Sequence, residues 1–474
     1  MSTIQSPYPL ILCIMASALI LIGATAPFLT ILSLGASVIV ALCAAQSSIQ
    51  SPGPSICKGI ILLLCMQNLM IGLGAHVANN SNGSISYLTQ IPFIVIAVIW
   101  LFYFITDRLS GKALSKIEKM FIALVLCVGI SVIIGRGSIQ SIAITIRNLI
   151  VFFMSFQIGR RNLRGKRDFS LFSSFLVKLS IILVFVGEFL LIGGYNLQKK
   201  LGIHEVYIAK GSPFSEGSLD ARFYTTLIHT QYPRMGSLYF EPINLAYLFA
   251  AALVVSLFVP IYKDLFTKYI CSGILLIGLL QTVGKGGYLI IGCIVCCFIF
   301  ERFVQWFSAK VPSKRTKKKI IIFITAIIVC FFIFYVKYIG AAIMPHIWGI
   351  TQTWSNVIKR PWGYGLGTGG NAAQILGGAD SADWYSTGGE TALMSFCYQI
   401  GFQGIFFFIF VLLLTSVRKS KCFTPFFYLP TILLGISLMQ DNTFTPQCIT
   451  VFMFLQGGAQ AIESSTYDMT PDNG

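Results

Sequence analysis

The sequence has few charged residues, few acidic ones in particular, and very little histidine. Only 11% of its 474 residues are charged, 17 are Asp or Glu, and four are His. A soluble protein of this length needs a more strongly charged surface, so the composition excludes an ordinary soluble fold. The histidines do not cluster, and no cysteine lies at metal-ligand spacing from one, which disfavours a histidine-based metal site. We expect neither a metal nor a cofactor.

Long apolar runs fill the sequence instead. Mean hydropathy is +0.79, and the runs recur at close to the length of about 20 residues that crosses a bilayer. They predict an all-α, polytopic integral membrane protein that forms one domain, residues 1–474, with about 12–14 transmembrane helices. The expected spans lie near residues 8–25, 28–46, 58–75, 91–106, 120–135, 141–158, 171–194, 241–260, 269–283, 286–300, 320–340, 391–414, 425–440 and 443–461.

The basic residues fall on one side of these spans. Lys and Arg outnumber Asp and Glu by 34 to 17 and crowd the segments 108–119, 160–167, 302–319 and 418–421. The positive-inside rule assigns that side, and with it both termini, to the cytoplasm. The excess of basic charge thus indicates topology, and no nucleic-acid-binding module accompanies it. No Lys or Arg precedes the first run, so we expect that run to be retained as a span and not cleaved as a signal.

Two long external loops are predicted, at about 195–240 and 341–390. Both are rich in aromatic and acidic residues, and long loops between closely connected helices are usually functional or disordered. Aromatic rings offer flat faces to sugars, which makes Tyr239, Trp362 and Tyr364 candidate sugar-binding residues. An alternative for the tryptophans is an aromatic belt at the membrane interface.

The segment from Arg234 to Ala246 is a charged entry into an apolar span. Pro242 suits the first turn of a helix, which places Glu241 near the cap position and Asn244 on the first turn, as a candidate sugar ligand. Arg234 carries a permanently charged fork that matches phosphate oxygens. The alternative is that Glu241 only caps the helix and pairs with Arg234.

Further polar residues lie at or near the same external side. Lys285 lies in a glycine-rich turn, Thr282 to Gly287, where a second cation would help to neutralise a diphosphate; a plain turn with an interfacial lysine is the alternative. Arg147 lies about two turns inside a predicted span, where charge is costly and usually functional. Glu390 begins another span. It is interpreted either as a helix cap or as an acid/base carboxylate.

A glycine-rich stretch, Gly365 to Gly370, formally matches G-x-G-x-x-G. That pattern indicates dinucleotide binding only between a strand and a helix of a soluble domain, a context that is missing here. A flexible gate or a nest of backbone N–H groups for phosphate is the preferred interpretation.

These motifs, in this order, resemble the bacterial O-antigen polymerase/ligase superfamily, and in particular its Wzy-type polymerases. The resemblance covers about residues 234–404, whereas the N-terminal part matches only in hydropathy. It rests on Arg234-Met-Gly236 with Glu241 to Ala246, on Thr282 to Gly286, on Pro361 to Gly367, and on Glu390-Thr391 with Gly401 and Gly404.

The resemblance implies a metal-independent membrane glycosyltransferase of GT-C-like architecture in the bacterial inner membrane. Its substrate would be an oligosaccharide repeat unit on undecaprenyl diphosphate, which is joined to another at the periplasmic face to build O-antigen or a related surface polysaccharide. Arg234, Lys285, Arg147 and Arg222 would stabilise the leaving diphosphate. Glu241, in preference to Glu390, would deprotonate the attacking hydroxyl. Such systems usually include a chain-length regulator, which is the expected protein partner.

Two departures from the family pattern matter. Lys285 stands where an arginine is common, which keeps the charge but loses the bidentate fork. The ligases typically carry a histidine near the position of Glu390, and no histidine follows His346, which favours a polymerase over a ligase. A ligase of the same superfamily and a lipid or polysaccharide transporter (a flippase) are the alternatives.

Overall fold

The computed structural model describes residues 7–78, 83–135, 137–209, 223–227, 230–310, 340–375, 384–417 and 424–467. Nearly all of them are helical. The long helices are α1 (Tyr8–Gly23), α2 (Pro27–Gln50), α3 (Ser55–Val77), α4 (Ile91–Leu109), α5 (Lys116–Ile134), α6 (Ile139–Asn162), α7 (Lys166–Lys200), α9 (Pro242–Phe258), α10 (Leu265–Thr282), α11 (Lys285–Lys310), α13 (Gly340–Lys359), α15 (Ala392–Leu414), α16 (Thr424–Ser437) and α17 (Pro446–Tyr467).

Apolar helices form the bulk of the described chain. Nine of them are long and apolar enough to cross a membrane, and three shorter ones are also apolar. Every expected span coincides with a helix except 320–340, of which residues 320–339 lie outside the described part of the chain. The prediction of an all-α polytopic membrane protein is therefore confirmed at this level.

The two regions predicted as external loops contain regular structure. Helix α7 continues to Lys200 across a kink at Gly194, and α8 (Ile203–Ala209) follows it. Strands β1 (Tyr224–Leu227) and β2 (Thr230–Pro233) pair antiparallel, and the 3-10 helix η3 (Ser237–Tyr239) leads into α9. The second region contains α13, the short α14 (Gly370–Ile375) and η5 (Tyr385–Thr387).

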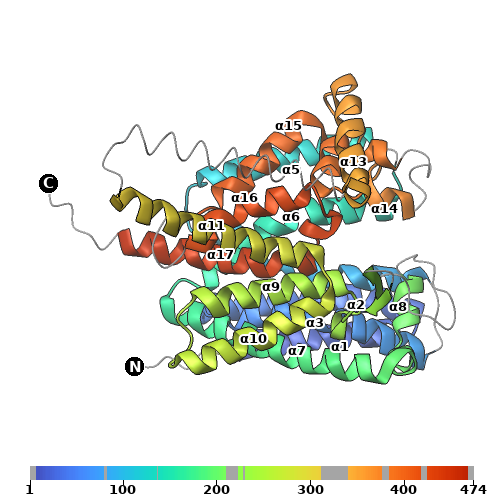
Figure 1. Ribbon diagram of the computed structural model, residues 1–474. Coiled ribbons are helices and arrows are strands. Elements are labelled where there is room, and N and C mark those ends of the chain that lie inside the picture. The colour runs from blue at the N-terminus through green and yellow to red at the C-terminus, as the bar shows by residue number, and fades with distance from the viewer. Residues whose placement is uncertain are drawn as a thin grey trace.

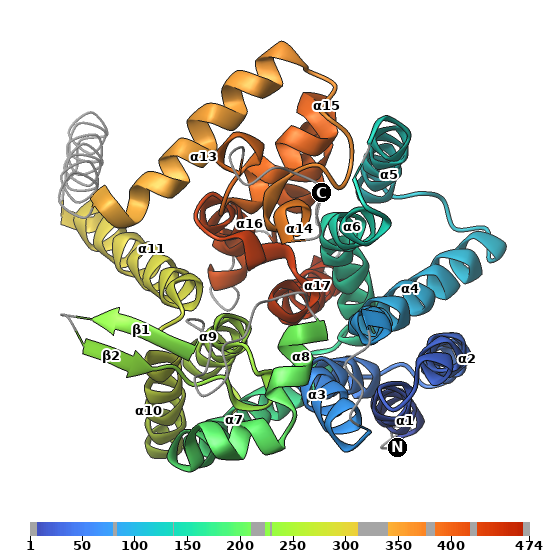
Figure 2. The same ribbon diagram turned by 90° about the vertical axis from the view of Figure 1, so that its right-hand side faces the viewer.

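The helices run between two chemically different ends of one bundle (Figure 1). We call one the basic end: it comprises the connections 110–115 and 163–165 with their flanking Lys and Arg residues. We call the other the polar end: it comprises the starts of α6, α9, α11, α15 and α17, and it faces the viewer in Figure 2. The basic segments that the structure describes thus lie together at one end of the bundle, as the sequence predicted.

Helix α17 lies in the middle of this bundle (Figure 2). Every residue from Cys448 to Ala459 is buried, and the backbones of α17 and α6 approach closely at Gly159 and Gly457. Gln456, fully buried, donates to the carbonyl oxygens of Thr415 and Phe426 at 2.9 Å. Helix α17 can thus carry polar side chains inside a membrane protein, because the neighbouring helices supply their hydrogen-bond partners.

Helix α13 crosses the polar end instead of running along the bundle, as both views show (Figures 1 and 2). His346, Thr353 and Val357 are buried on one of its faces, whereas Trp348 and Trp354 are exposed on another. This amphipathic arrangement brings an ionisable side chain, His346, into the bundle end.

Candidate functional site

The entry into α9 is held in place by hydrogen bonds with three other helices. Ser237 and Phe240 have positive φ values of 45° and 47°, which are unusual for residues other than glycine. Tyr207 of α8 donates to the Phe240 carbonyl oxygen at 2.8 Å, and Asn68 of α3 donates to that of Tyr239. The Ser237 hydroxyl donates to the carbonyl oxygen of Leu183 in α7 at 2.8 Å. These bonds fix the backbone between Arg234 and Glu241.

Arg234 spans the turn between α10 and α11. Its Nε donates to the Thr282 carbonyl oxygen at 2.9 Å and its Nη2 to that of Val283 at 3.3 Å. Among the described residues, Nη1 has no hydrogen-bond partner. Burial lowers the pKa of Arg234, whereas the negative charge of Glu241 acts in the opposite direction, so the two side chains share one electrostatic environment. The guanidinium stays charged, because arginine does not lose its proton in proteins.

Glu241 occupies the cap position of α9 but does not act as a cap. Its backbone is extended, with φ −150° and ψ 100°, and its side chain makes no capping hydrogen bond, so the interpretation of Glu241 as a simple cap is wrong. The residue is only 4% exposed. A buried carboxylate requires nearby groups that offset its charge, and Arg234 is one such cation.

A second group of ionisable side chains comes from α11, α13 and the start of α15. His346 Nε2 lies 3.5 Å from Glu390 Oε2, with the histidine side chain 6% exposed and the glutamate side chain 47% exposed. Burial is the largest effect on the pKa of His346 and lowers it; Glu390 raises it and Lys285 lowers it further. Lys285, exposed at the first turn of α11, therefore belongs to the same neighbourhood. The imidazole is consequently neutral at neutral pH.

His346 is the residue that sequence reasoning missed. The sequence signal that could have identified it is its position on the apolar face of an amphipathic stretch. That stretch was predicted to be part of a long loop and is instead helix α13. Glu390 precedes the actual cap residue of α15, Thr391, and pairs with His346 instead of capping. A histidine thus lies beside Glu390 in space, so its absence later in the sequence does not exclude a ligase.

Arg147 lies elsewhere at the polar end. Its Nη1 donates to Gln90 Oε1 at 3.3 Å and its Nε to Asn148 Oδ1 at 3.2 Å. Gln90 precedes α4, and α4 and α6 lie on the opposite side of α17 from α10 and α11 (Figure 2). The structure therefore does not bring Arg147 together with Arg234 and Lys285. Arg222 lies outside the described residues.

The candidate sugar ligands differ in accessibility. Tyr239 is 1% exposed and forms part of the core, with its hydroxyl 3.4 Å from Cys65 Sγ. Asn244 is 8% exposed and accepts from Cys448 Sγ at 3.2 Å. Tyr364 stacks on Tyr398 with ring centroids 4.3 Å apart. Trp362 alone of these candidates is widely exposed, at 68%.

The first half of the glycine-rich stretch, Gly365 to Gly367, is a packing element and not a nest for phosphate. Gly365 and Gly367 have φ values of 92° and 78°, and a Cβ at either would meet the α5–α6 connection. The N–H groups of Gly365 and Gly367 donate to the backbone carbonyl and side-chain oxygens of Gln399, and the Leu366 N–H donates to a carbonyl oxygen of α5. These donors are not free to bind phosphate.

Asp441 adds a further carboxylate at the polar end. It lies in the 3-10 helix η6 (Asp441–Phe444), just before α17, and accepts a hydrogen bond from Asn371. The Asn371 amide oxygen in turn accepts from Trp384 Nε1 at 2.8 Å. This network joins the second external region to the centre of the bundle.

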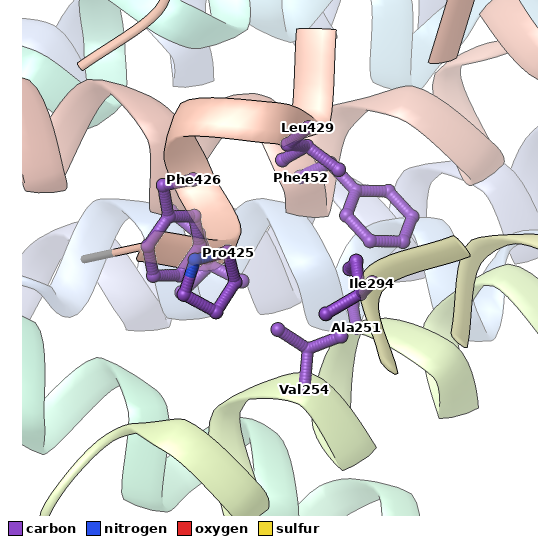
Figure 3. Close-up of a pocket in the computed structure, with 8 residues that line it drawn as sticks. Ala251, Val254, Ile294, Pro425, Phe426, Leu429 and Phe452 are labelled. Carbon is purple, nitrogen blue, oxygen red and sulfur yellow. The ribbon is translucent and has the colours of Figure 1, made fainter. Parts of the chain in front are cut away.

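An apolar pocket lies between α9, α11, α16 and α17 (Figure 3). Its lining residues are Ala251, Val254, Ile294, Pro425, Phe426, Leu429, Phe452 and Leu455. They come from the second half of α9 and the first turns of α16, toward the basic end, and none offers a polar side chain. This pocket is therefore separate from the ionisable residues described above.

Comparison of the chain with protein-family models, with curated proteins and with solved structures finds no match. Among the described residues, no three His, Cys, Asp or Glu side chains form a group that could hold a metal ion.

Proposed function

We propose that this protein is a membrane glycosyltransferase that polymerises oligosaccharide repeat units carried on undecaprenyl diphosphate. The observation that carries the proposal is the convergence of ionisable side chains at the polar end of an otherwise apolar bundle. Arg234 and Glu241 form one electrostatic unit, and Lys285, His346 and Glu390 form another. The α10–α11 turn connects the two, because Arg234 binds its carbonyl groups and Lys285 begins α11.

The proposed reaction forms one bond, breaks one bond and transfers one proton. A hydroxyl oxygen of the incoming repeat unit bonds to the anomeric carbon of the growing chain, and the bond from that carbon to the diphosphate oxygen breaks. The diphosphate leaves with the electron pair, and Arg234 and Lys285 stabilise its negative charge. The hydroxyl proton passes to a general base, for which buried Glu241 is the first candidate.

The structure adds His346 with Glu390 as a second candidate for the base. A neutral imidazole accepts a proton, and the carboxylate beside it stabilises the resulting cation. This pair also favours the second candidate function, an O-antigen ligase, in which the acceptor is another glycolipid. Both functions use the same leaving group and the same cations.

The orientation of the protein supports an external site. Lys and Arg residues gather at the basic end, and the positive-inside rule assigns that end to the cytoplasm. The polar end then faces the periplasm of a bacterial inner membrane, where a polymerase of this class would meet its lipid-linked substrates. A chain-length regulator is the proposed protein partner.

Surface-polysaccharide gels from a deletion strain test the function. Wild-type protein is expected to restore a ladder of chain lengths, whereas Arg234→Ala and Glu241→Gln leave only single-repeat species. Lys178→Ala removes a membrane cation exposed on α7 and serves as the control that keeps the ladder.

Three outcomes separate the alternatives. Single-repeat species in the deletion strain support a polymerase. Loss of even these species supports a ligase or a flippase, and an unchanged ladder overturns the proposal. A full ladder with Glu241→Gln at normal protein level would remove Glu241 as the base and leave His346 with Glu390.

A further inference from the structure

Arg147 is a membrane-embedded cation with neutral partners. It lies eight residues into α6, a helix that is apolar enough to cross the membrane, and its side chain is partly exposed. Its hydrogen bonds go to the amides of Gln90 and Asn148. Within the described part of the chain, no carboxylate lies within ion-pair distance of Arg147. A cation at this depth without an anionic partner is costly, so a ligand is the natural source of the missing charge.

A continuous belt of polar groups leads away from Arg147. Gln90 Nε2 donates to Thr89 Oγ1 at 3.2 Å, and the Thr89 carbonyl oxygen accepts from Gln67 Nε2 at 2.9 Å. Gln67 Oε1 accepts from Gln447 Nε2 at 2.8 Å. All of these groups are uncharged, and Gln90 and Gln447 are partly exposed.

The belt ends at the entry into α9. Cys448, the residue after Gln447, donates to Asn244 Oδ1, and Asn244 is one turn from Glu241. The belt thus runs from Arg147 of α6, across α17 from α10 and α11, to the start of α9, whose cap position holds the carboxylate that we propose as the base (Figure 2). Amides and hydroxyls are the groups that exchange hydrogen bonds with sugar hydroxyls.

We propose that Arg147 and Gln90 form a second anion-binding subsite, separate from Arg234, that takes a phosphate or carboxylate group of a glycolipid whose sugars lie along the partly exposed side of the belt, at Gln90 and Gln447, with buried Gln67 holding the belt together. The ligand's identity as a glycolipid rests on the proposed function, whereas the anion site itself rests on Arg147 and its neutral surroundings. The anion comes either from the lipid diphosphate of the second substrate or from an acidic sugar in the repeat unit. These sources share one chemistry and are separable by experiment.

The experiment measures binding to the purified full-length protein in detergent, with two probes. One is a short-chain prenyl diphosphate without sugar, and the other is a hexuronate-containing oligosaccharide without lipid. If Arg147 takes a diphosphate, Arg147→Gln binds one prenyl diphosphate per chain fewer than the wild type does. If Arg147 takes an acidic sugar, Arg147→Gln weakens binding of the oligosaccharide by about tenfold or more and leaves prenyl diphosphate stoichiometry unchanged.

Two further variants keep the result interpretable. Gln90→Glu places an internal carboxylate against Arg147 without removing the cation, and we expect it to lose the same binding. It therefore tests the anion site even if Arg147→Gln does not fold. Lys178→Gln removes a membrane cation from α7 and is expected to bind both probes as the wild type does. If Arg147→Gln and Gln90→Glu both bind as Lys178→Gln does, there is no second anion site.

The binding measurement is independent of the polymerase proposal. An unchanged polysaccharide ladder in the Arg234→Ala strain would overturn the proposed function but not the anion site. Unchanged binding in the Arg147 and Gln90 variants would overturn the anion site but not the proposed function.

Discussion

At the scale of single residues, charged side chains at the polar end can do two things: they can hold the structure together, and they can bind a ligand. Arg234 does both, since Nε and Nη2 bind backbone carbonyls of the α10–α11 turn while its charge remains next to Glu241. Hydrogen bonds from a charged donor contribute about 1.5–3 kcal/mol each. A lysine at this position would keep the charge but could not span both carbonyls, so Arg234→Lys is not a conservative change.

His346 should make the protein sensitive to mild acid. Its pKa lies below the ordinary value of 6.5, mainly because the ring is buried. Above pH 6.5 the ring is neutral in both the folded and the unfolded chain, and its contribution to stability is fully present. As the pH falls from 6.5 toward the folded-state pKa, the unfolded chain takes up the proton first, and stability is lost.

Thermal unfolding in detergent at pH 7 and at pH 5 measures this effect. The wild type is expected to unfold at a lower temperature at pH 5, and His346→Gln should show a smaller difference between the two conditions. Equal differences in the two proteins would mean that another group is responsible for the acid sensitivity.

At the scale of elements, backbone contacts between distant segments position the site. The glycine-rich stretch passes against the α5–α6 connection, and Gln399 of α15 holds two of its N–H groups. Helix α13 precedes this stretch and α15 follows it. The stretch therefore determines where His346 of α13 meets Glu390, which immediately precedes α15.

Gly365→Ala should be strongly destabilising. A residue with a side chain at φ 92° is strained by about 1–2 kcal/mol, and the new Cβ would clash with the Gly135 backbone. Gly273→Ala, in α10, meets no atom within 4 Å and serves as the control. We expect Gly365→Ala to lower the unfolding temperature and the yield of folded protein, with Gly273→Ala close to wild type. A Gly365→Ala protein of wild-type stability would show that the stretch does not hold these elements together.

At the scale of the whole molecule, charge is distributed unequally between the two ends of the bundle. The basic end carries clustered Lys and Arg residues, and the polar end carries Glu241, Glu390 and Asp441 beside a few cations. Such a distribution orients a membrane protein during insertion.

Reporter fusions test this orientation. Alkaline phosphatase, which is active only outside the cytoplasm, is expected to be inactive when fused after Gly111 at the basic end. It should be active when fused after Thr282 at the polar end. The reverse pattern would place the proposed site in the cytoplasm and contradict a periplasmic transferase.

The sequence by itself determined the helices and the two ends. Long apolar runs leave the chain no other way to satisfy its backbone in a bilayer, so their positions predicted all the long helices of the described residues except α13, which lies in a region predicted as a loop. The electrostatic influence of Glu241 on Arg234 was also within reach of sequence reasoning, because the two residues are close in sequence and both precede a proline-initiated helix.

Only the tertiary structure decided which distant polar groups meet. His346 and Glu390 are 44 residues apart, and their contact depends on α13 lying across the polar end. Arg147 was grouped with Arg234 because both are cations near one face, yet the packing of α17 between α6 and α10 separates them. Hydropathy specifies which segments lie in the membrane, whereas the faces that helices present to one another depend on close packing of side chains, to which no short motif corresponds.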